Sequence, residues 1–346
     1  MLFVGDIALP FSRSIQIINF PSTLLNKEWY GNLEGGIVDN SECYYKNYKA
    51  VFNDASAVTE LTEKFNFVGF ALANNHIFDT TCINNNIKFL ESLNIPYSGI
   101  GDNITDASKP LILKKDKVII LNFGWEVIQC EIAKENLTGV NPLKKDHVLA
   151  VLKDTVAKYP DANLIPYMHW SYELEAEPQP FERVLAKKMI DMGAAGVIGS
   201  HPHRVGGFEL YKGKPIVYSL GNWMFKQNYY FNGKLAFPDF CNLELAFEWD
   251  FEQNEFKFHF FNYDRIKSTL TYLSTEDEKS PTMLQHTPFL NLSDNDYKSW
   301  YRNNHYHKNK GLPIYYWEDS SWLIKIKNKW VNIRAKLMRF FLSKGK

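Results

Sequence analysis

The chain has 346 residues, with 39 Lys and Arg against 39 Asp and Glu, so its formal net charge at pH 7 is zero. This balance excludes a chain-wide positive field for duplex nucleic acid, and we expect no nucleic-acid partner. A hydrophobic share of 45% excludes general disorder, while no apolar run in the sequence is long enough to span a bilayer.

The N-terminal segment and the cysteines indicate where the protein acts. Met1 to Pro10 is apolar but carries Asp6, and it lacks the basic start and long apolar stretch of a signal peptide. The four cysteines lie far apart without a CxxC pair, which is typical of reduced thiols. We therefore predict a cytoplasmic protein, with the inner face of the membrane as the alternative. These cysteines are Cys43, Cys82, Cys130 and Cys241.

Five short apolar runs each lead into polar, metal-capable or small residues. Their length and composition predict buried strands. Open α/β sheets bind ligands at the carboxyl ends of their strands, so we expect these polar residues to meet at one edge. The runs are Leu2 to Val4 before Gly5-Asp6, Phe67 to Leu72 before Ala73-Asn74-Asn75-His76, Asn163 to Met168 before His169-Trp170, Ala195 to Gly199 before Ser200-His201-Pro202-His203, and Ile216 to Leu220 before Gly221-Asn222.

Apolar residues at helical spacing lie between these strands. The clearest helix is predicted over Phe181 to Met192, with Pro180 near its start and Gly193 just past its end. The alternation of strands and helices predicts an α/β layered domain over residues 1–265. Weaker helices are predicted over Ala55 to Lys64, Asn84 to Leu93 and His147 to Tyr159.

The pattern changes after residue 242. Leu243 to Phe251 and Phe256 to Asn262 predict a hairpin added at the sheet edge. Residues 266–321 are aromatic-rich and predict an irregular extension. Residues 322–346 predict a basic amphipathic helix, which could lie on an anionic membrane, dock on a partner, or pack on its own domain with a solvated basic face.

The strongest chemical signal is Gly199-Ser200-His201-Pro202-His203, directly after a predicted strand. Side chains at i and i+2 of an extended segment point the same way, so both imidazoles can approach one site. A single histidine after a strand is usually structural, but His76, His169, Asp6 and Glu34 occur in comparable positions. Imidazoles and carboxylates without Cys suit Zn, Mn or Fe, and a carboxylate can bridge two such ions. We therefore predict a hydrolytic metal site.

Six short motifs follow one another over roughly the first two thirds of the chain. In this order they resemble the motifs of the CapA family of poly-gamma-glutamate capsule proteins. The resemblance implies a metallophosphoesterase-like four-layer α/β/β/α sandwich, here with a C-terminal amphipathic helical tail. The motifs are Val4-Gly5-Asp6, Asn32-Leu33-Glu34, Ala73-Asn74-Asn75-His76 with Asp79, His169-Trp170-Ser171-Tyr172-Glu173, Gly199-Ser200-His201-Pro202-His203 and Tyr218-Ser219-Leu220-Gly221-Asn222.

The resemblance also implies a ligand set for divalent metal, as two ions of Mn, Zn or Fe. His76 would be the general acid for the leaving group, and Asp79 or Glu173 would orient it by a hydrogen bond. The implied ligands are Asp6 and His203 for one ion, Asn75, His169 and His201 for the second, and Glu34 as the bridge between them.

Three further residues are candidates for substrate binding. Arg13 and Arg204 could grip a carboxylate or phosphate through paired N–H donors, although surface arginines are more commonly solvated. Asn222, at the end of the last motif, is the third candidate.

The leading function is metal-dependent hydrolysis in capsule or surface-polymer biosynthesis, acting on an amide or peptide-like bond of a polyanionic polymer such as poly-gamma-glutamate. The second hypothesis is a phosphoesterase that uses the same two-metal site, with a phosphorylated small molecule as substrate. The third is a non-catalytic polymer-binding or assembly subunit, with peripheral membrane contact through residues 322–346.

Overall fold

A computed structural model describes residues 1–10, 15–38, 51–80, 83–113, 117–226, 229–230 and 235–344. The candidate substrate residue Arg13 and two of the cysteines, Cys43 and Cys82, lie outside these ranges. Within them, Cys130 and Cys241 are buried free thiols, as the wide spacing of the cysteines predicts.

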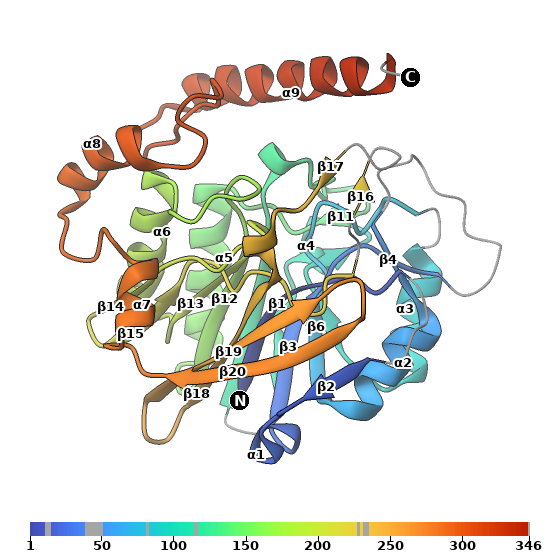
Figure 1. The fold of residues 1–346 in the computed structure, drawn as a ribbon. Coiled ribbons are helices and arrows are strands. Elements are labelled where there is room, and N and C mark those ends of the chain that lie inside the picture. The colour runs from blue at the N-terminus through green and yellow to red at the C-terminus, as the bar shows by residue number, and fades with distance from the viewer. Residues whose placement is uncertain are drawn as a thin grey trace.

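An eight-stranded sheet is built around the first predicted strand (Figure 1). On one side of β1, three strands follow in parallel, and on the other side β18 begins an antiparallel meander. The order across the sheet is β2 (Gln16–Ile18), β20 (Thr269–Glu276), β19 (Glu255–Asp264), β18 (Leu243–Asp250), β1 (Leu2–Ile7), β3 (Glu28–Leu33), β6 (Asn66–Ala71) and β7 (Tyr97–Ser98).

A six-stranded sheet contains the remaining predicted strands. Its four central strands are parallel, and an antiparallel strand closes each edge. The parallel strands are nearly all fully buried, as expected for strands covered on both faces. The order is β14 (Phe208–Tyr211), β15 (Lys214–Val217), β13 (Val197–Ser200), β12 (Asn163–His169), β10 (Val118–Gly124) and β9 (Leu111–Leu113).

The two sheets share one apolar core. Phe3 and Phe247 of the first sheet and Ile120 and Ile165 of the second belong to the same cluster of buried side chains. A hydrogen bond also joins the two sheets: the hydroxyl of Tyr167 on β12 donates to the carbonyl of Val4 on β1 at 2.7 Å. The ends of β1 and β12 are therefore held together next to the residues expected to bind metal.

Helices lie on the outer side of each sheet (Figure 1). The predicted mixed α/β class is confirmed, and helix α2 has the predicted bounds because Asp54 caps its first turn through Ser56 and Ala57. The helices that cover the sheets are α2 (Ala55–Lys64) and α3 (Ile83–Ser92) beside the first sheet, and α5 (Lys145–Lys158) and α6 (Pro180–Asp191) beside the second.

Short elements connect these layers. They include the helices α1 (Ser22–Leu25) and α4 (Ile104–Ala107), the 3₁₀ turns η2 (Glu126–Ile128) and η3 (Asp239–Asn242), and the strand pairs β4 (Gly36–Val38) with β5 (Phe52–Asp54), β8 (Ile100–Gly101) with β11 (Gly139–Val140), and β16 (Tyr229–Tyr230) with β17 (Leu235–Ala236).

Two expectations for the C-terminal third are wrong. The hairpin β18–β19 lies inside the sheet and not at its edge, because β18 pairs with β1 and β20 adds a further strand. The segment after residue 266 is not irregular. It contains β20, which belongs to the main sheet, and two helices, α7 (Pro281–His286) and α8 (Asp294–Asn304).

The chain continues into helix α9 (Ser321–Lys344), which runs across the top of the molecule (Figure 1). Among the helices in the described part of the chain, none combines the length and the apolar composition that crossing a bilayer requires.

Candidate metal centre

Asp6 lies in β1 and is fully buried. Its Oδ1 accepts a hydrogen bond from the Asn32 amide at 2.8 Å, and its Oδ2 accepts one from the backbone N–H of His201 at 2.9 Å. Burial raises the pKa of the Asp6 carboxyl to about 7, against these two hydrogen bonds, which lower it. The carboxylate is thus oriented by both sheets at once.

Glu34 follows β3 and is also fully buried. Neither of its carboxylate oxygens has a hydrogen-bond partner among the described residues. Burial, and next the charge of Asp6, raise the pKa of Glu34 well above its ordinary value. Buried acids without partners are rare, because an uncompensated carboxylate is costly away from water. A cation bound between the acids would remove this cost.

Three histidines face these acids from the second sheet. His169 is the last residue of β12, whereas His201 and His203 lie in the loop after β13. The expectation of an extended His-Pro-His segment is wrong, since His201 has φ +95° and His203 has φ +56°. Such left-handed conformations are strained for residues other than glycine and cluster at functional sites. This strained loop, and not strand alternation, brings the two imidazoles to one place.

Burial favours the neutral form of these three imidazoles. His203 Nδ1 lies 2.9 Å from Asn222 Oδ1, and His169 Nδ1 lies 3.0 Å from Ser200 Oγ. Burial lowers the pKa of His203 to about 3 and lowers those of His169 and His201 well below the ordinary value. In a neutral imidazole, a hydrogen bond at Nδ1 fixes the ring and directs Nε2 toward a metal, as in His203, whereas Nε2 of His169 contacts a further side chain.

The side chains form two overlapping groups of metal-ligand type. Glu34, His169 and His201 form one group and Asp6, Glu34 and His203 the other, and within each group the ligand atoms lie within 4.8 Å of one another. Glu34 belongs to both groups. The Oδ1 of Asn75 lies 2.8 Å from His169 Nε2, so this amide joins the first group. His201 Nδ1 is buried without a partner in the described residues, like the Glu34 oxygens. The site thus brings together all six expected ligands and fits divalent metal.

His76 stands at the edge of this cluster. Its Nδ1 lies 2.6 Å from Asp79 Oδ2, and its Nε2 lies 3.8 Å from Glu34 Oε1. Asp79 is itself fixed by the backbone N–H of Val51 at 3.0 Å. The side chain of Glu173 is exposed, and its negative charge contributes to the raised pKa of Glu34. Of the two acids expected to orient His76, Asp79 makes the contact.

The candidate substrate residues have different surroundings. Asn222 is fully buried, and both ends of its amide are used, by His203 Nδ1 and by the carbonyl of Cys241 at 3.2 Å. These contacts favour a role in orienting His203 over the expected substrate contact, which stays a prediction. The guanidinium of Arg204 lies 4.7 Å from the ring centroid of Phe240, and its N–H reaches the carbonyl of Leu174 at 3.5 Å.

Supporting amides were not identified from the sequence. Asn32 orients Asp6, and Asn74 in turn donates to Asn32 Oδ1 at 3.1 Å and accepts from the backbone N–H of His76 at 3.1 Å. The signal available was their place in the Asn-Leu-Glu and Asn-Asn-His motifs. These amides connect the Asp6 carboxylate to the backbone of His76 by hydrogen bonds.

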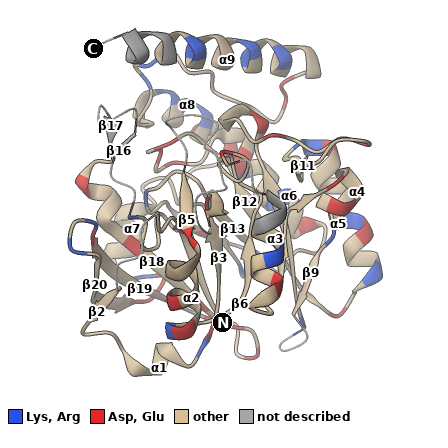
Figure 2. Cartoon of the chain, turned by 90° about the vertical axis from the view of Figure 1, so that its right-hand side faces the viewer, with Lys and Arg blue, Asp and Glu red and all other residues tan. Residues whose placement is uncertain are grey.

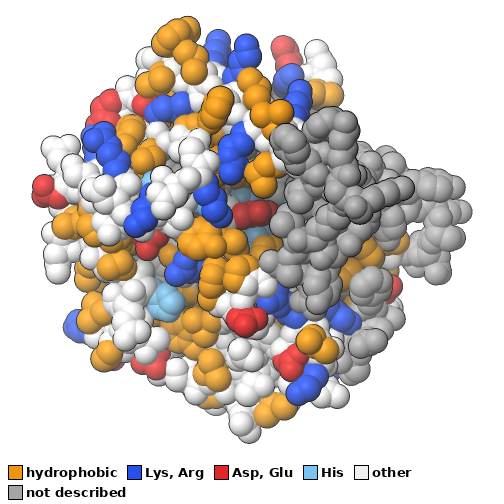
Figure 3. All heavy atoms as spheres, turned by 45° about the horizontal axis from the view of Figure 1, so that its top comes forward, with side chains coloured by type: hydrophobic (Ala, Val, Ile, Leu, Met, Phe, Trp, Pro, Cys, Tyr) orange, Lys and Arg blue, Asp and Glu red, His pale blue; other side chains and the backbone are white. Residues whose placement is uncertain are grey.

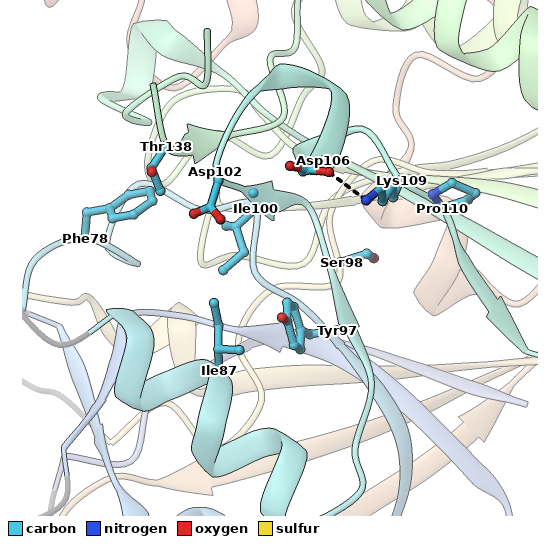
Figure 4. A pocket seen from close by; sticks show the side chains of 11 residues that line it. Phe78, Ile87, Tyr97, Ser98, Ile100, Asp102, Asp106, Lys109, Pro110 and Thr138 are labelled. Carbon is cyan, nitrogen blue, oxygen red and sulfur yellow. Dashed lines mark ion pairs between the residues drawn. The ribbon is translucent and has the colours of Figure 1, made fainter. Parts of the chain in front are cut away.

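The surface is hollowed on the face that α9 crosses. Figure 3 shows acidic and histidine side chains in this hollow, with basic and hydrophobic side chains around it. A separate cavity of about 300 Å³ lies beside the His76 loop (Figure 4). Phe78, Ile87, Tyr97 and Asp102 line it, and no residue of the two ligand groups does.

Comparison with known proteins identifies related sequences. The model of the family "Bacterial capsule synthesis protein PGA_cap" matches residues 27–227. The PGA biosynthesis protein CapA of Bacillus subtilis is 29% identical over 204 residues, which cover 56% of this chain and 53% of that protein. The capsule biosynthesis protein CapA of Bacillus anthracis is 29% identical over 249 residues, covering 66% and 60%.

A more distant relative is a probable polyglutamine synthesis accessory protein of Mycobacterium tuberculosis, 25% identical over 62% of this chain and 58% of that protein. The matched part of the chain thus spans between about half and three fifths of these relatives. Among solved structures, the NAD nucleotidase of Haemophilus influenzae aligns with 64% of this chain and 36% of its own, at 12% identity and a TM-score of 0.30.

Proposed function

This chain belongs to the family of bacterial capsule synthesis proteins, and from this premise we propose that it is a divalent-metal-dependent hydrolase of capsule or surface-polymer biosynthesis. One observation carries the proposal. Two carboxylates and three neutral imidazoles converge in a buried cluster, and both oxygens of Glu34 lack a hydrogen-bond partner within the described ranges. Packing alone gives no reason to bury such a set.

The fold assignment is part of the same proposal. We propose a metallophosphoesterase-like four-layer sandwich, which the two packed sheets with helices on their outer sides support. In that arrangement the metal centre lies where the carboxyl ends of strands from both sheets meet. The positions of Asp6 on β1 and His169 on β12 support this.

The ligand roles follow the two groups. Asp6 and His203 would bind one ion, Asn75, His169 and His201 the other, and Glu34 both. Bound divalent ions, Mn, Zn or Fe, supply Lewis acidity and make water a stronger nucleophile at neutral pH.

His76 would act as the general acid. His76 would do this in its doubly protonated form, in which Nδ1–H donates to Asp79 and Nε2–H can be given to a leaving group beside Glu34. Glu173, exposed close to Glu34, and Arg204 remain candidates for contact with substrate, as does Arg13 from outside the described residues.

The proposed substrate is a polyanionic polymer with gamma-linked glutamate units, cleaved at an amide bond. The names of the Bacillus relatives, which refer to capsule and PGA biosynthesis, support this class. A phosphoesterase is the second candidate, since a pair of ligand groups sharing one carboxylate also suits the displacement at a phosphate ester.

One assay separates these reactions. The full chain is stripped with a chelator, reloaded with Mn or Zn, and incubated with gamma-linked glutamate oligomers or with an aromatic phosphate ester. We expect metal-dependent release of new amines from the oligomers. The variant His76→Asn should lose roughly 10²- to 10⁴-fold in rate, which is the usual contribution of a general acid.

His147→Asn is the matched control, because His147 lies outside both ligand groups and bonds to Asn141 at 2.8 Å. It should keep the full rate. Turnover of the phosphate ester alone would favour the phosphoesterase. Metal binding without turnover of either compound would leave the non-catalytic polymer-binding role, and a protein that binds no metal would overturn the proposal.

A further inference from the structure

Helix α9 exposes a continuous apolar stripe. Trp322 is 71% exposed, Ile326 43%, Trp330 52%, Ile333 42% and Leu337 53%. At 3.6 residues per turn, these five positions fall within an arc of about 80° on one side of the helix. Large apolar side chains rarely gather on a free surface, so this stripe marks an interaction site.

The charged residues of this helix are all basic. Residues 321–346 contain eight Lys and Arg and no Asp or Glu. Figure 2 shows the blue bands of Lys and Arg along α9 without red between them. Lys325, Lys329 and Lys336 are exposed and lie directly beside the apolar stripe on the helix surface. A partner that covers the stripe therefore meets a row of positive charges.

The opposite face of α9 is anchored to the protein, which fixes how the stripe points. Val331 is only 8% exposed and belongs to the main core. Asn328 accepts a hydrogen bond from the Tyr315 hydroxyl at 2.9 Å, and Lys327 pairs with Asp319 at 2.5 Å. Because this face is already buried, the exposed stripe cannot be the side that packs on the rest of the chain.

A short series of contacts joins α9 to the metal centre. The Tyr315 ring that contacts Asn328 lies 5.0 Å from the ring of Trp125. The backbone N–H of Trp125 donates to the carbonyl of His169 at 3.1 Å. Helix α9 also contacts η2, directly after Trp125. The helix is thus held on the side of the molecule where the ligand groups lie.

We propose that the exposed face of α9 docks on an anionic lipid bilayer. The stripe would lie among the acyl chains and headgroups, with the lysines against the anionic headgroups, as in helices that lie in the plane of a membrane. Two tryptophans suit this boundary because their rings are apolar with one polar group. The proposal goes beyond the hydrolase assignment and does not depend on it: it places the side of the molecule that carries the ligand groups near a membrane surface.

Flotation with vesicles tests the docking. The full chain is mixed with phosphatidylcholine vesicles with or without phosphatidylglycerol, at low and high salt. We expect flotation with the anionic vesicles at low salt, weakened by high salt. The variant Lys325→Gln/Lys329→Gln should bind them roughly 25-fold more weakly. Trp322→Ser/Leu337→Ser should lose binding at either salt concentration.

Matched controls remove exposed residues of the same kind elsewhere. Ile266 and Leu273 are 78% and 51% exposed, so Ile266→Ser/Leu273→Ser deletes a comparable apolar surface. The side chains of Lys267 and Lys279 are 78% and 87% exposed, so Lys267→Gln/Lys279→Gln removes two comparable positive charges. Both controls should float like the native chain, and unchanged circular dichroism verifies folding of all variants.

Three results would overturn the proposal. One is equal flotation of the Trp322→Ser/Leu337→Ser variant and the native chain. Another is no flotation with either kind of vesicle. The third is a native chain that is dimeric by light scattering and fails to float, while the same variant is monomeric, because the stripe would then join two copies of this chain.

Discussion

At Glu34, a carboxylate is enclosed by protein without any donor to satisfy it among the residues that the structure describes. In the absence of metal, its raised pKa means that the carboxyl keeps a proton more readily than an ordinary glutamate does. A bound ion would replace that proton. We therefore propose that Glu34 lowers the stability of the metal-free protein and in return binds metal.

The variant Glu34→Gln tests whether Glu34 binds metal at a cost in stability of the metal-free protein. The amide has nearly the same volume but carries no charge, so it should be tolerated in the buried site while it removes the shared ligand. We expect the purified variant to contain less metal than the native chain, by mass spectrometry of the metal content. In the presence of a chelator it should unfold at a temperature equal to or above that of the native chain.

Glu182→Gln provides the comparison. Glu182 is also buried, but its carboxylate caps the first turn of α6 through Gln179 N–H, at 2.8 Å, and glutamine can preserve this cap. Metal content should therefore be unchanged in Glu182→Gln. A Glu34→Gln protein that retains the native amount of metal would remove Glu34 from the ligand set.

Asn222 is predicted to act on metal affinity through His203. In Asn222→Leu, the imidazole loses the acceptor that orients its Nδ1. Loss of such a partner typically weakens metal binding by about 10- to 100-fold. Titration of the chelator-treated protein with Zn measures this. If Asn222 contacts substrate instead, its substitution would raise KM and leave the metal affinity unchanged. That outcome would favour the substrate contact expected from the sequence.

Residue types near strand ends were enough to predict that Asp6, His169 and His201 lie together, but not which side chains orient them. Acids and imidazoles directly after apolar runs are unusual, and the ligand roles themselves stay a prediction from the family resemblance. The hydrogen bonds of Asn32 and Asn222 depend on which side chains meet across the fold, and an asparagine beside a strand has many ordinary roles. No sequence pattern indicates the left-handed backbone conformations of His201 and His203 either.

At the scale of the elements, strand β1 needs a glycine at position 5 to approach the segment around Gly221. A Cβ on Gly5 would lie 1.9 Å from the carbonyl oxygen of Gly221, in the segment that carries Asn222. The backbone of Asp6 donates to that same oxygen at 3.0 Å. The Gly-Asp motif at the start of the chain therefore combines a ligand with the residue that lets the strand approach this segment.

Gly5→Ala should accordingly destabilise the protein by about 3 kcal/mol or more, because backbone must move to relieve the overlap. Urea unfolding with linear extrapolation measures the change. Gly213→Ala is the control: its added Cβ meets nothing within 4 Å, and only its φ of +73° is unfavourable. That variant should lose about 1 to 2 kcal/mol. Equal losses in the two variants would contradict the role assigned to the close approach.

The elements with strong local patterns were predicted and the others were not. Helix α6 and hairpin β18–β19 have end signals, turns and periodicity that are visible in the sequence. Strand β20 mixes exposed and buried positions without clear alternation, so it was assigned to an irregular segment. The pairing of β1 with β18 joins opposite ends of the domain, and no local pattern specifies it.

For the whole molecule, the ligand groups link the two sheets. Asp6 and Glu34 come from the first sheet or directly after it, whereas His169 ends a strand of the second and His203 follows another. Each group of ligands includes residues from both sides. A bound ion would therefore fasten together the two layers whose shared core forms the centre of the protein.

Metal should consequently raise the unfolding temperature of the whole chain in one transition. A ligand at 100 times its Kd that binds only the folded state adds about 2.7 kcal/mol to the free energy of unfolding. We expect scanning calorimetry of the chelator-treated protein to show a midpoint that increases with added Mn or Zn, while the Glu34→Gln protein stays unchanged. If metal shifted only part of the heat signal, into a second transition, it would stabilise one layer alone. A midpoint independent of metal would mean that the buried acids and imidazoles do not hold ions across the sheets.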